Sequence, residues 1–451
     1  MKAIILAAGH GTRMRTKTQK VMHPILGKPI VQYVTDACIG AGIEDITLVV
    51  SGESDDMRAA LPGFNYAVQT ERLGTGHAVQ AAAGFIKPED DVLVIAGDMP
   101  LITSDFIREF AEFYTAKACS SVVSAVYMPN AGDFGRVYVG ENGAFEAIVE
   151  ARDLLPDSPL TNWANTSIYL FKGAALLNGL SQISNSNSQG EYYLTDVPKI
   201  LRDAGHRVYA FQSRDDVSNF TGINTQAQLA EAAQLMRMRI NLRHMSSGVR
   251  MLDPATTYID DTVKIAPNVV IYPGCILEGA CEIGEDSIIG PYTHMKNTKV
   301  SKAAAIRQSV LSDSTIGEGT TVGPFAYLRA SAVIGKKCRI GNFVEIKNAN
   351  LSDGVKMAHL AYIGDADVGR NVNYSCGAIT ANYDGKNKHR TVIEDGVFVG
   401  CNANLVAPLT IGAGALIAAG STVTEAVPAE CLTIARARQV NKEGRAKKRT
   451  E

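Results

Sequence analysis

Short apolar runs recur through the first half of the chain, and longer stretches with helical spacing separate some of them. Residues 3–6, 46–50, 92–96 and 122–126 have the length and composition of buried strands. Residues 29–39 and 104–116 lie between some of these runs and read as helices. Strands that alternate with helices indicate a mostly parallel, Rossmann-like sheet covered by helices. We therefore predict an α/β domain over residues 1–225.

Residues 226–245 are rich in Ala, Leu, Met and Arg and contain neither Gly nor Pro. This composition predicts one helix, and the Ser246-Ser247-Gly248 sequence that follows would end it. We assign residues 226–247 to a helical linker and residues 248–451 to a second domain.

The second domain carries an aliphatic residue at every sixth position over three stretches. The positions are Ile259, Ile265, Ile271, Leu277, Ile283 and Ile289; Ile316, Val322, Leu328, Ile334, Ile340 and Ile346; and Ile393, Val399, Leu405, Ile411, Ile417 and Val423. A period of six fits neither an α-helix nor a long amphipathic strand. It fits a solenoid in which each repeat forms one short strand and one corner, and three repeats close a coil around a dry interior. We predict a left-handed parallel β-helix of hexapeptide repeats.

The six-residue phase breaks twice, around residues 295–311 and 380–392. Breaks in a solenoid commonly mark loops that leave the wall, and such loops often carry function. We therefore expect a loop at each break.

The charge balance and the cysteines narrow the class of protein. Charged residues make up 20% of the 451 residues and the net charge is −2, so nothing favours nucleic acid or a membrane surface as partner. A membrane-spanning run of about 18 apolar residues is missing from the sequence. The eight cysteines form no CxxC motif and read as reduced thiols, which predicts a cytoplasmic protein.

Two features of the first domain could bind phosphate and metal. Gly9 and Gly11 follow the first strand, where exposed backbone N–H groups either dock a phosphate or form a plain connection. The turn is neither a Walker A loop nor a dinucleotide fingerprint, but Arg13 and Lys20 follow it and suit a triphosphate. Asp98 comes just after the run 92–96, where it is either a Mg²⁺ ligand or a turn-forming or capping residue.

Four segments of the first domain resemble the signature of sugar-1-phosphate nucleotidyltransferases. They are Leu6-Ala-Ala-Gly-His-Gly-Thr-Arg13, Gln19-Lys-Val-Met-His-Pro24, Gln69-Thr-Glu-Arg-Leu-Gly-Thr-Gly-His77 and Ala96-Gly-Asp98. Together with the hexapeptide repeats, they make nearly the whole chain similar to one family. This is the family of bacterial bifunctional N-acetylglucosamine-1-phosphate uridyltransferases and glucosamine-1-phosphate acetyltransferases.

In the first domain, the resemblance implies uridyl transfer from UTP to N-acetylglucosamine 1-phosphate, with release of pyrophosphate. It assigns Leu6, Ala7, Ala8, Gly9 and Lys20 to the nucleotide, Gln69, Gly74 and Thr75 to the uracil, Gly135, Glu150 and Asn165 to the sugar, and Asp98 and Asn224 to Mg²⁺. The attacking group is already an anionic phosphate, so no general base is needed. Positioning and charge neutralisation, by Arg13 and Lys20 among others, would suffice.

In the second domain, the resemblance implies acetyl transfer from acetyl-CoA to glucosamine 1-phosphate. A lone histidine is more often a surface or core residue, but His359 matches the family's general base, which would deprotonate the sugar's ammonium group. The resemblance assigns Arg329, Lys347, Tyr362 and Asn373 to the sugar phosphate, and Cys376, Asn382, Tyr383, Cys401, Ala419 and Arg436 to acetyl-CoA. The two steps would make UDP-N-acetylglucosamine for cell-envelope polysaccharides.

The chain departs from the family's pattern at several of these sites. Ala96 stands where some members have Tyr, and Ala330-Ser331 stands where some have Pro-Gly after the arginine. Others have Ala and Ser in place of Cys376 and Cys401. We favour a packing role for the two thiols, with a reactive role as the alternative.

Two other functions fit part of the sequence. One is a monofunctional sugar-1-phosphate nucleotidyltransferase with a regulatory or oligomerising β-helix. The length of the β-helix, with all three hexapeptide stretches, and the presence of His359, Arg329 and Lys347 speak against it. The other is a non-enzymatic scaffold, which Lys20 and Asp98 oppose. The family resemblance also predicts a homotrimer, small-molecule substrates, and no binding of nucleic acid or membrane.

Overall fold

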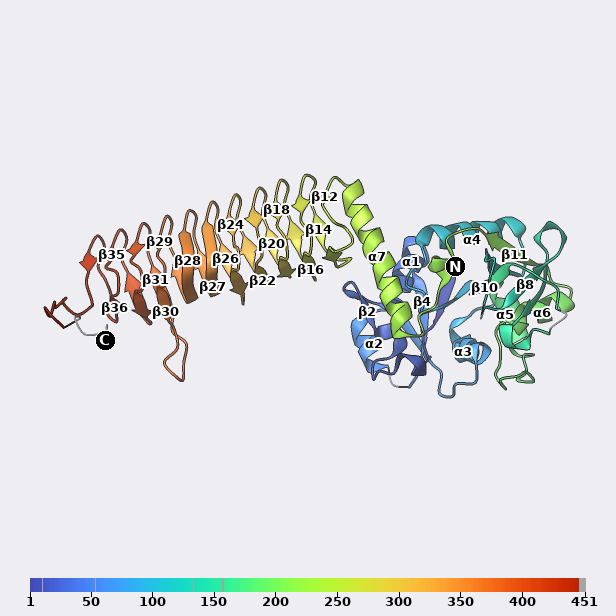
Figure 1. Cartoon of the computed structure of the whole chain (residues 1–451). Helices are drawn as coiled ribbons and strands as arrows, with labels where there is room; N and C mark the ends of the chain where they lie inside the picture. Colours follow the sequence, from blue (N-terminus) through green and yellow to red (C-terminus); the bar gives the residue numbers. More distant parts are fainter. Residues whose placement is uncertain (10, 53, 133, 156–157, 446–451) are drawn as a thin grey trace, which may run out of the picture. The chain divides into compact units, whose positions relative to one another are not determined.

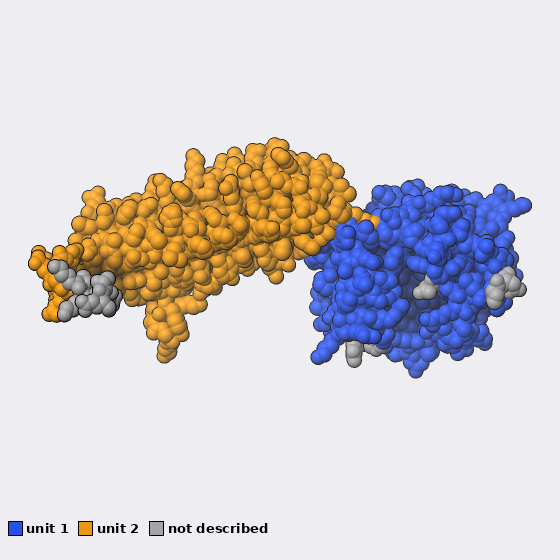
Figure 2. Space-filling model, viewed as in Figure 1, with its two compact units in different colours: residues 1–236 blue, residues 237–451 orange. Residues whose placement is uncertain are grey.

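The computed structural model describes residues 1–9, 11–52, 54–132, 134–155 and 158–445. The chain divides into two compact units, residues 1–236 and 237–451 (Figure 2). This division falls within the helix α7 (Gln226–Ser246), near its middle. His10, in the predicted glycine turn, lies outside the described residues.

The first unit is built on a sheet whose seven main strands run in the order β11-β7-β10-β6-β1-β4-β5 (Figure 1). Their bounds are β1 (Lys2–Leu6), β4 (Asp45–Val50), β5 (Asn65–Val68), β6 (Asp91–Ala96), β7 (Ser121–Tyr127), β10 (Trp163–Lys172) and β11 (Val208–Ser213). The four predicted strands are confirmed to within a residue at each end. Along this path only β10 runs antiparallel to its neighbours, and the hairpin β8 (Arg136–Val139) and β9 (Phe145–Val149) pairs beside it.

Helices cover both faces of this sheet. They are α1 (Ile30–Gly40), α2 (Asp55–Ala60), α3 (Thr75–Ala81), α4 (Ser104–Lys117), α5 (Gly173–Leu180) and α6 (Asp196–Asp203), so the two predicted helices are confirmed. Successive strand residues point to opposite faces, and Ile4 and Ile5 of β1 accordingly enter two different hydrophobic cores. A sheet buried on both faces leaves the strand ends as the place where polar groups can meet a ligand.

The predicted linker helix is confirmed as α7, and Gly248 follows its end. Gly248 has φ +92°, a left-handed conformation that suits glycine, and its N–H donates to Met245 O at 3.0 Å. Asn241 is fully buried and donates from Nδ2 to the carbonyls of Pro254 (2.8 Å) and Thr257 (2.9 Å). The last turns of α7 are thereby joined to the first coil of the second unit.

The second unit is a parallel β-helix that runs from β12 (Arg250–Met251) to β37 (Leu432–Thr433) (Figure 1). Residues of β13, β14 and β15 pair with the residue 18 positions further on, as Ile259 does with Leu277 and Ile271 with Ile289. These aliphatic side chains are buried, so the hexapeptide repeat is confirmed as a stack of three-stranded coils with an apolar interior.

We predicted a loop at the first phase break, and this prediction is wrong. Strands β19 (His294–Lys296), β20 (Lys299–Val300), β21 (Ala305–Ile306) and β22 (Val310–Ser312) stay in the wall of the β-helix. Met295 pairs with Leu311, only 16 positions further on, and both side chains are buried. Coils here hold 17 or 16 residues in place of 18, as the pairing of Ile289 with Ile306 also shows, so the phase of the sequence shifts while the chain stays in the wall.

The second phase break does form a loop, as predicted. Asp367 pairs with Val392, 25 positions further on, so the coil holds more residues than its three walls need. The surplus leaves the wall as residues 382–390, between β30 (Ile379–Ala381) and β31 (Thr391–Ile393), and Figure 1 shows this excursion below β30.

At the corner after Arg329, this chain has Ala330-Ser331 where some family members have Pro-Gly. Ala330 (φ +52°) and Ser331 (φ +64°) both adopt left-handed backbone conformations. Proline holds φ near about −65°, so it could not occupy position 330 in this conformation. This corner is therefore built differently from a corner with the sequence Arg-Pro-Gly.

Candidate functional site

Two adjoining cavities open at the carboxyl ends of β1 and β6 in the first unit. The smaller one, of about 430 Å³, is lined by most of the residues predicted for the nucleotide and uracil: Leu6, Ala8, Gly9, Lys20, Gln69, Gly74 and Thr75. The larger one, of about 630 Å³, is lined by the residues predicted for the sugar and metal, namely Gly135, Glu150, Asn165, Asp98 and Asn224, and by Arg13. Ala96, Asp98, Glu150, Ser167 and Gln189 line both, so the two predicted subsites meet.

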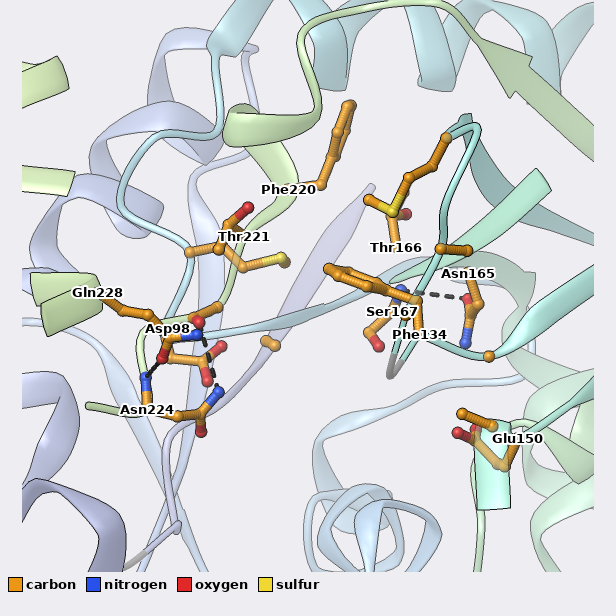
Figure 3. Close-up of a pocket in the computed structure, with 18 of the residues that line it drawn as sticks. Asp98, Phe134, Glu150, Asn165, Thr166, Ser167, Phe220, Thr221, Asn224 and Gln228 are labelled. Atoms are coloured by element: carbon orange, nitrogen blue, oxygen red, sulfur yellow. Dashed lines mark hydrogen bonds between the residues drawn. The ribbon is translucent and has the colours of Figure 1, made fainter. Parts of the chain in front are cut away.

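Figure 3 shows the larger cavity, with Asp98 and Asn224 on one side and Asn165 and Glu150 on the other. Burial raises the pKa of the Glu150 carboxyl, and the nearby Asp153 and Asp196 act in the same direction against a hydrogen bond from Thr195. Asn165 is 5% exposed, and its Nδ2 donates to the hydroxyl of Tyr169 at 2.8 Å. The sugar side is thus bordered by a carboxyl and an amide that the protein holds in place.

At the junction of the cavities, Lys20 links the two predicted metal ligands. Its Nζ donates to Asp98 Oδ2 at 2.6 Å and to Asn224 Oδ1 at 3.0 Å. The side chains of Lys20 and Asp98 are only 12% and 17% exposed, so this contact is largely shielded from water. The two oxygens converge on one cationic centre.

Two glycines allow this close arrangement. Gly11 has φ +61°, and a Cβ there would lie 2.5 Å from Cβ of Lys20. A Cβ at Gly222 would lie 3.1 Å from the Asp98 carboxylate, while the backbone N–H of Ile223 donates to Asp98 O at 3.0 Å. The backbone can therefore approach both charged side chains closely only because these positions lack side chains.

The donor set at this junction fits a magnesium ion. One carboxylate oxygen and one amide oxygen converge on a point now held by an ammonium group. Mg²⁺ takes oxygen ligands, and it is commonly bound by one or two protein groups together with water and substrate phosphates. In the described part of the chain no three His, Cys, Asp or Glu residues gather as a metal cluster.

One predicted nucleotide residue lies elsewhere, and several lining residues were missed. Ala7 is buried in the core between the sheet and its helices, and its N–H donates to Val49 O at 2.8 Å. The structure adds Arg72, Gln189 and Thr195 to the smaller cavity, and Arg72 Nε donates to Ala8 O at 3.2 Å. These three come from connecting segments, where the strand pattern gives no signal.

In the second unit, His359 lies in β28 (Lys356–Val368), next to Asn342 of β27 (Arg339–Leu351). The two residues are in register, and Asn342 Oδ1 accepts a hydrogen bond from His359 Nδ1 at 3.1 Å. The imidazole is exposed. In the neutral tautomer that satisfies this contact, Nδ1 carries the proton, because an amide oxygen can only accept, and Nε2 is the acceptor.

Two cations predicted for the sugar phosphate, Arg329 and Lys347, lie together with a third, Lys388. Arg329 and Lys347 are in register on adjacent coils, and Arg329 also donates to Glu345 Oε1 from Nε (3.0 Å) and Nη2 (2.6 Å). The pKa of Lys347 is lowered, first because the Lys388 side chain hydrogen-bonds to it and then through burial and the charges of Lys388 and Arg329. Lys388 was missed because it lies on the excursion 382–390, which the repeat pattern cannot align.

Polar contacts attach the base of this excursion to the wall. The buried Asn382 donates from Nδ2 to Asp365 Oδ2, and Asn348 Nδ2 donates to Asp365 Oδ1 at 2.5 Å. Burial alone would raise the pKa of Asp365, but these hydrogen bonds and the charges of Lys347 and Lys388 lower it instead. Asp365 therefore stands as a carboxylate beside the cations.

The remaining predicted residues lie on different parts of the β-helix: Tyr362 pairs with Ile379, whereas Asn373 pairs with Phe398 on another wall. Tyr362 and Asn373 are half-buried, Tyr383 is exposed on the excursion, and Ala419 and Arg436 are exposed on later coils. Cys376 is half-buried and Cys401 is exposed, so neither is a core packing residue. Arg436 Cδ lies 3.7 Å from the position of a Cβ at Gly420, which joins Arg436 to the column next to Ala419.

Comparison with known proteins agrees with both halves. Residues 3–161 match the family described as MobA-like NTP transferase domain, and residues 262–297, 313–348 and 390–425 match the bacterial transferase hexapeptide (six repeats). The fold and these matches define a nucleotidyltransferase unit joined to a hexapeptide-repeat transferase unit, with the left-handed parallel β-helix that the sequence predicts.

Relatives with both halves match over nearly the whole chain. Bifunctional protein GlmU of Geobacillus sp. (strain WCH70) is 47% identical over 443 residues, 98% of this chain and 96% of its own length. The GlmU proteins of Exiguobacterium sp. (strain ATCC BAA-1283 / AT1b) and Clostridioides difficile (strain 630) are 45% and 42% identical and cover 99% and 100% of this chain and 99% and 98% of their own lengths. The chain belongs to the family of bifunctional GlmU proteins.

The helices of the described residues do not meet the requirements of a membrane span. Among them, none combines the length and the apolar character that a crossing needs.

The cation cluster gives a direct prediction. Lys388→Ala removes the neighbour that most depresses the pKa of Lys347, so that pKa should rise towards its ordinary value. Side-chain NMR titration of Lys347 measures the shift. Lys386→Ala changes another exposed lysine of the same excursion and should leave Lys347 as it was. An unchanged Lys347 titration in Lys388→Ala would contradict the proximity of the two amines.

Proposed function

We propose that the two sites described above make UDP-N-acetylglucosamine in two successive steps. As a bifunctional GlmU protein, the chain is a glucosamine-1-phosphate acetyltransferase and an N-acetylglucosamine-1-phosphate uridyltransferase. The observation that carries the assignment of the first step is the His359–Asn342 pair on adjacent coils of the β-helix. The observation that carries the assignment of the second step is the junction of two cavities at Lys20, Asp98 and Asn224.

In the acetyl step, we assign His359 as the general base. Its Nδ1–H is held by Asn342, so Nε2 is free to take a proton from the ammonium of glucosamine 1-phosphate. The amine then attacks the thioester carbonyl carbon of acetyl-CoA, and the CoA sulfur leaves with the bonding electrons and is protonated. Arg329, Lys347 and Lys388 provide the positive charge that would hold the sugar phosphate.

In the uridyl step, positioning and charge carry the catalysis. The two cavities meet at Asp98, so a nucleotide in the smaller and a sugar phosphate in the larger would bring their phosphates together at this junction. Lys20 and Arg13 would neutralise phosphate charge there, and the Gly9 turn would offer backbone N–H groups. Mg²⁺ held by Asp98 and Asn224 would supply further charge neutralisation when bound. The sugar phosphate needs no base because it is already anionic.

We further propose a homotrimer that associates through the β-helix. Tyr292, Phe325, Phe343 and Leu360 occupy equivalent corner positions in one column and are 72%, 53%, 57% and 58% exposed. Gln308 stands between Tyr292 and Phe325, and the column from Phe325 to Leu360, which adjoins His359, is apolar. The rings of Phe325 and Phe343 stack at 5.5 Å. Exposed apolar side chains in one row favour contact with another subunit. We also propose that the protein acts in the cytoplasm, where the proposed substrates UTP and acetyl-CoA would be available.

Sedimentation of the full-length protein should therefore give three times the mass of one chain. Phe343→Glu should shift it towards the monomer, because a charge would be buried at the contact. Phe398→Glu places the same charge on an exposed phenylalanine of another wall and should leave the mass unchanged. A monomeric wild-type protein would overturn the trimer.

For the uridyl site, Asp98→Ala should abolish uridyl transfer and leave acetyl transfer intact, because it removes a proposed metal ligand in the first unit only. Pyrophosphate release from UTP measures the first activity, and CoA thiol release measures the second. Asp105→Ala removes an exposed carboxylate that pairs with Arg108 on the surface, and it should affect neither. Wild-type uridyl transfer in Asp98→Ala would place the metal elsewhere.

For the acetyl site, His359→Ala should lower acetyl transfer by about 10²–10⁴-fold, the usual loss for a general base. Raising the pH should recover part of the rate, because the substrate amine then loses its proton without the enzyme's help. Uridyl transfer in the same sample should stay normal. His294→Ala, which breaks an exposed contact with Glu278 elsewhere on the β-helix, is the matched control. Acetyl transfer at the wild-type rate in His359→Ala would refute the assignment.

A further inference from the structure

The parallel register of the β-helix brings two cysteines together beside His359. Lys356 pairs with Asn373 and Tyr362 with Ile379, so His359 and Cys376 are in register on adjacent coils. Tyr374 pairs with Val399 and Ile379 with Asn404, which places Cys376 and Cys401 in register in the same way. The backbone N–H of Asn402 also donates to Cys376 O at 2.8 Å. One column of the wall thus reads Asn342, His359, Cys376, Cys401.

The spacing of this column lets neighbouring side chains meet. Asn342 and His359, the first two members, are joined by a hydrogen bond of 3.1 Å. Neighbouring strands lie about 4.8 Å apart, and a disulfide needs Cα atoms at about 4.4–6.8 Å. Cys401 is exposed and Cys376 is half-buried, whereas Cys275, Cys281 and Cys338 are buried in the β-helix. The pair is therefore close enough to bond and open enough to meet a small oxidant.

We propose that Cys376 and Cys401 form a reversible disulfide that switches off acetyl transfer, a regulation that rests on the proposed acetyltransferase function of this site. The oxidant is a hydroperoxide such as hydrogen peroxide. The exposed Cys401 thiolate attacks one peroxide oxygen, the O–O bond breaks, and a sulfenic acid and water form. The Cys376 thiolate then attacks the Cys401 sulfur and displaces the hydroxyl group, which leaves as water. Two thiols lose two electrons, and the peroxide becomes two waters.

The position of the bond explains its effect. Between Cys376 and Cys401 the chain carries the whole excursion 382–390, with the proposed ligands Asn382 and Tyr383 and the cation Lys388. A disulfide would tie the two coils from which this segment leaves, directly beside His359. It would also remove two thiols from positions assigned to acetyl-CoA. The first unit contributes nothing to this column, so uridyl transfer in the same molecule should be unaffected.

The experiment treats the full-length protein with hydrogen peroxide, blocks free thiols with iodoacetamide and maps peptides by mass spectrometry without reduction. Cys401 and Cys431 share one tryptic peptide, so a second cleavage after Glu425 and Glu430 separates them. Both activities are measured before oxidation, after it and after dithiothreitol. The variants are Cys376→Ala, Cys401→Ser and, as matched control, the half-buried Cys431→Ala. Each variant is compared with its own reduced form.

We expect a Cys376–Cys401 disulfide, loss of most acetyl transfer and its return with dithiothreitol in the wild type and in Cys431→Ala. Cys376→Ala and Cys401→Ser should keep the acetyl transfer they had before peroxide. The absence of the cross-linked peptide, or equal inactivation of all variants, would overturn the thiol pair. A reduced protein that never transfers acetyl groups would instead overturn the proposed function, while the peptide map would still report on the pair.

Discussion

The parallel register of the β-helix decides which side chains of the second unit can meet. Each residue lies beside its equivalent on the next coil, so residues far apart in sequence form straight columns along a wall. Inward columns are aliphatic and buried, as at Ile259, Leu277 and Met295. Outward columns can carry chemistry: Asn342 orients His359, and Arg329 lies beside Lys347. The acetyl site therefore depends on register more than on any single contact.

In the first unit, a mostly parallel open sheet brings distant residues together in a similar way. Leu6 at the end of β1 pairs with Ala96 at the end of β6, so the glycine turn and Asp98 leave the sheet at one edge. Lys20, on a connecting segment, then donates to both the Asp98 carboxylate and the amide oxygen of Asn224. Both units thus place polar side chains at points that buried apolar strands define.

Regular parts of the chain were predictable because burial repeats with a fixed period. The strands around Ile4, Leu48 and Val94, and the eighteen repeat positions of the β-helix, followed directly from it. The reversed direction of β10 was not predictable, because the direction of a strand is set by its pairing with β6 and β7 and leaves no trace in the apolar pattern. The loss of phase near Met295 looked like an insertion, although shortened coils cause it. The structure was needed to find the roles of Lys388 and Arg72, because both lie on irregular segments. It was also needed to show that Ala7 is buried.

The central claim is that one chain carries out both steps, and a labelled acetyl group tests it most directly. The full-length protein would receive glucosamine 1-phosphate, acetyl-CoA labelled in the acetyl carbons, UTP and Mg²⁺. Our account predicts that the label appears in UDP-N-acetylglucosamine, with CoA and pyrophosphate released in equal amounts. Unlabelled UDP-N-acetylglucosamine that forms only when N-acetylglucosamine 1-phosphate is supplied would contradict it, because the β-helix would then lack acetyl transfer.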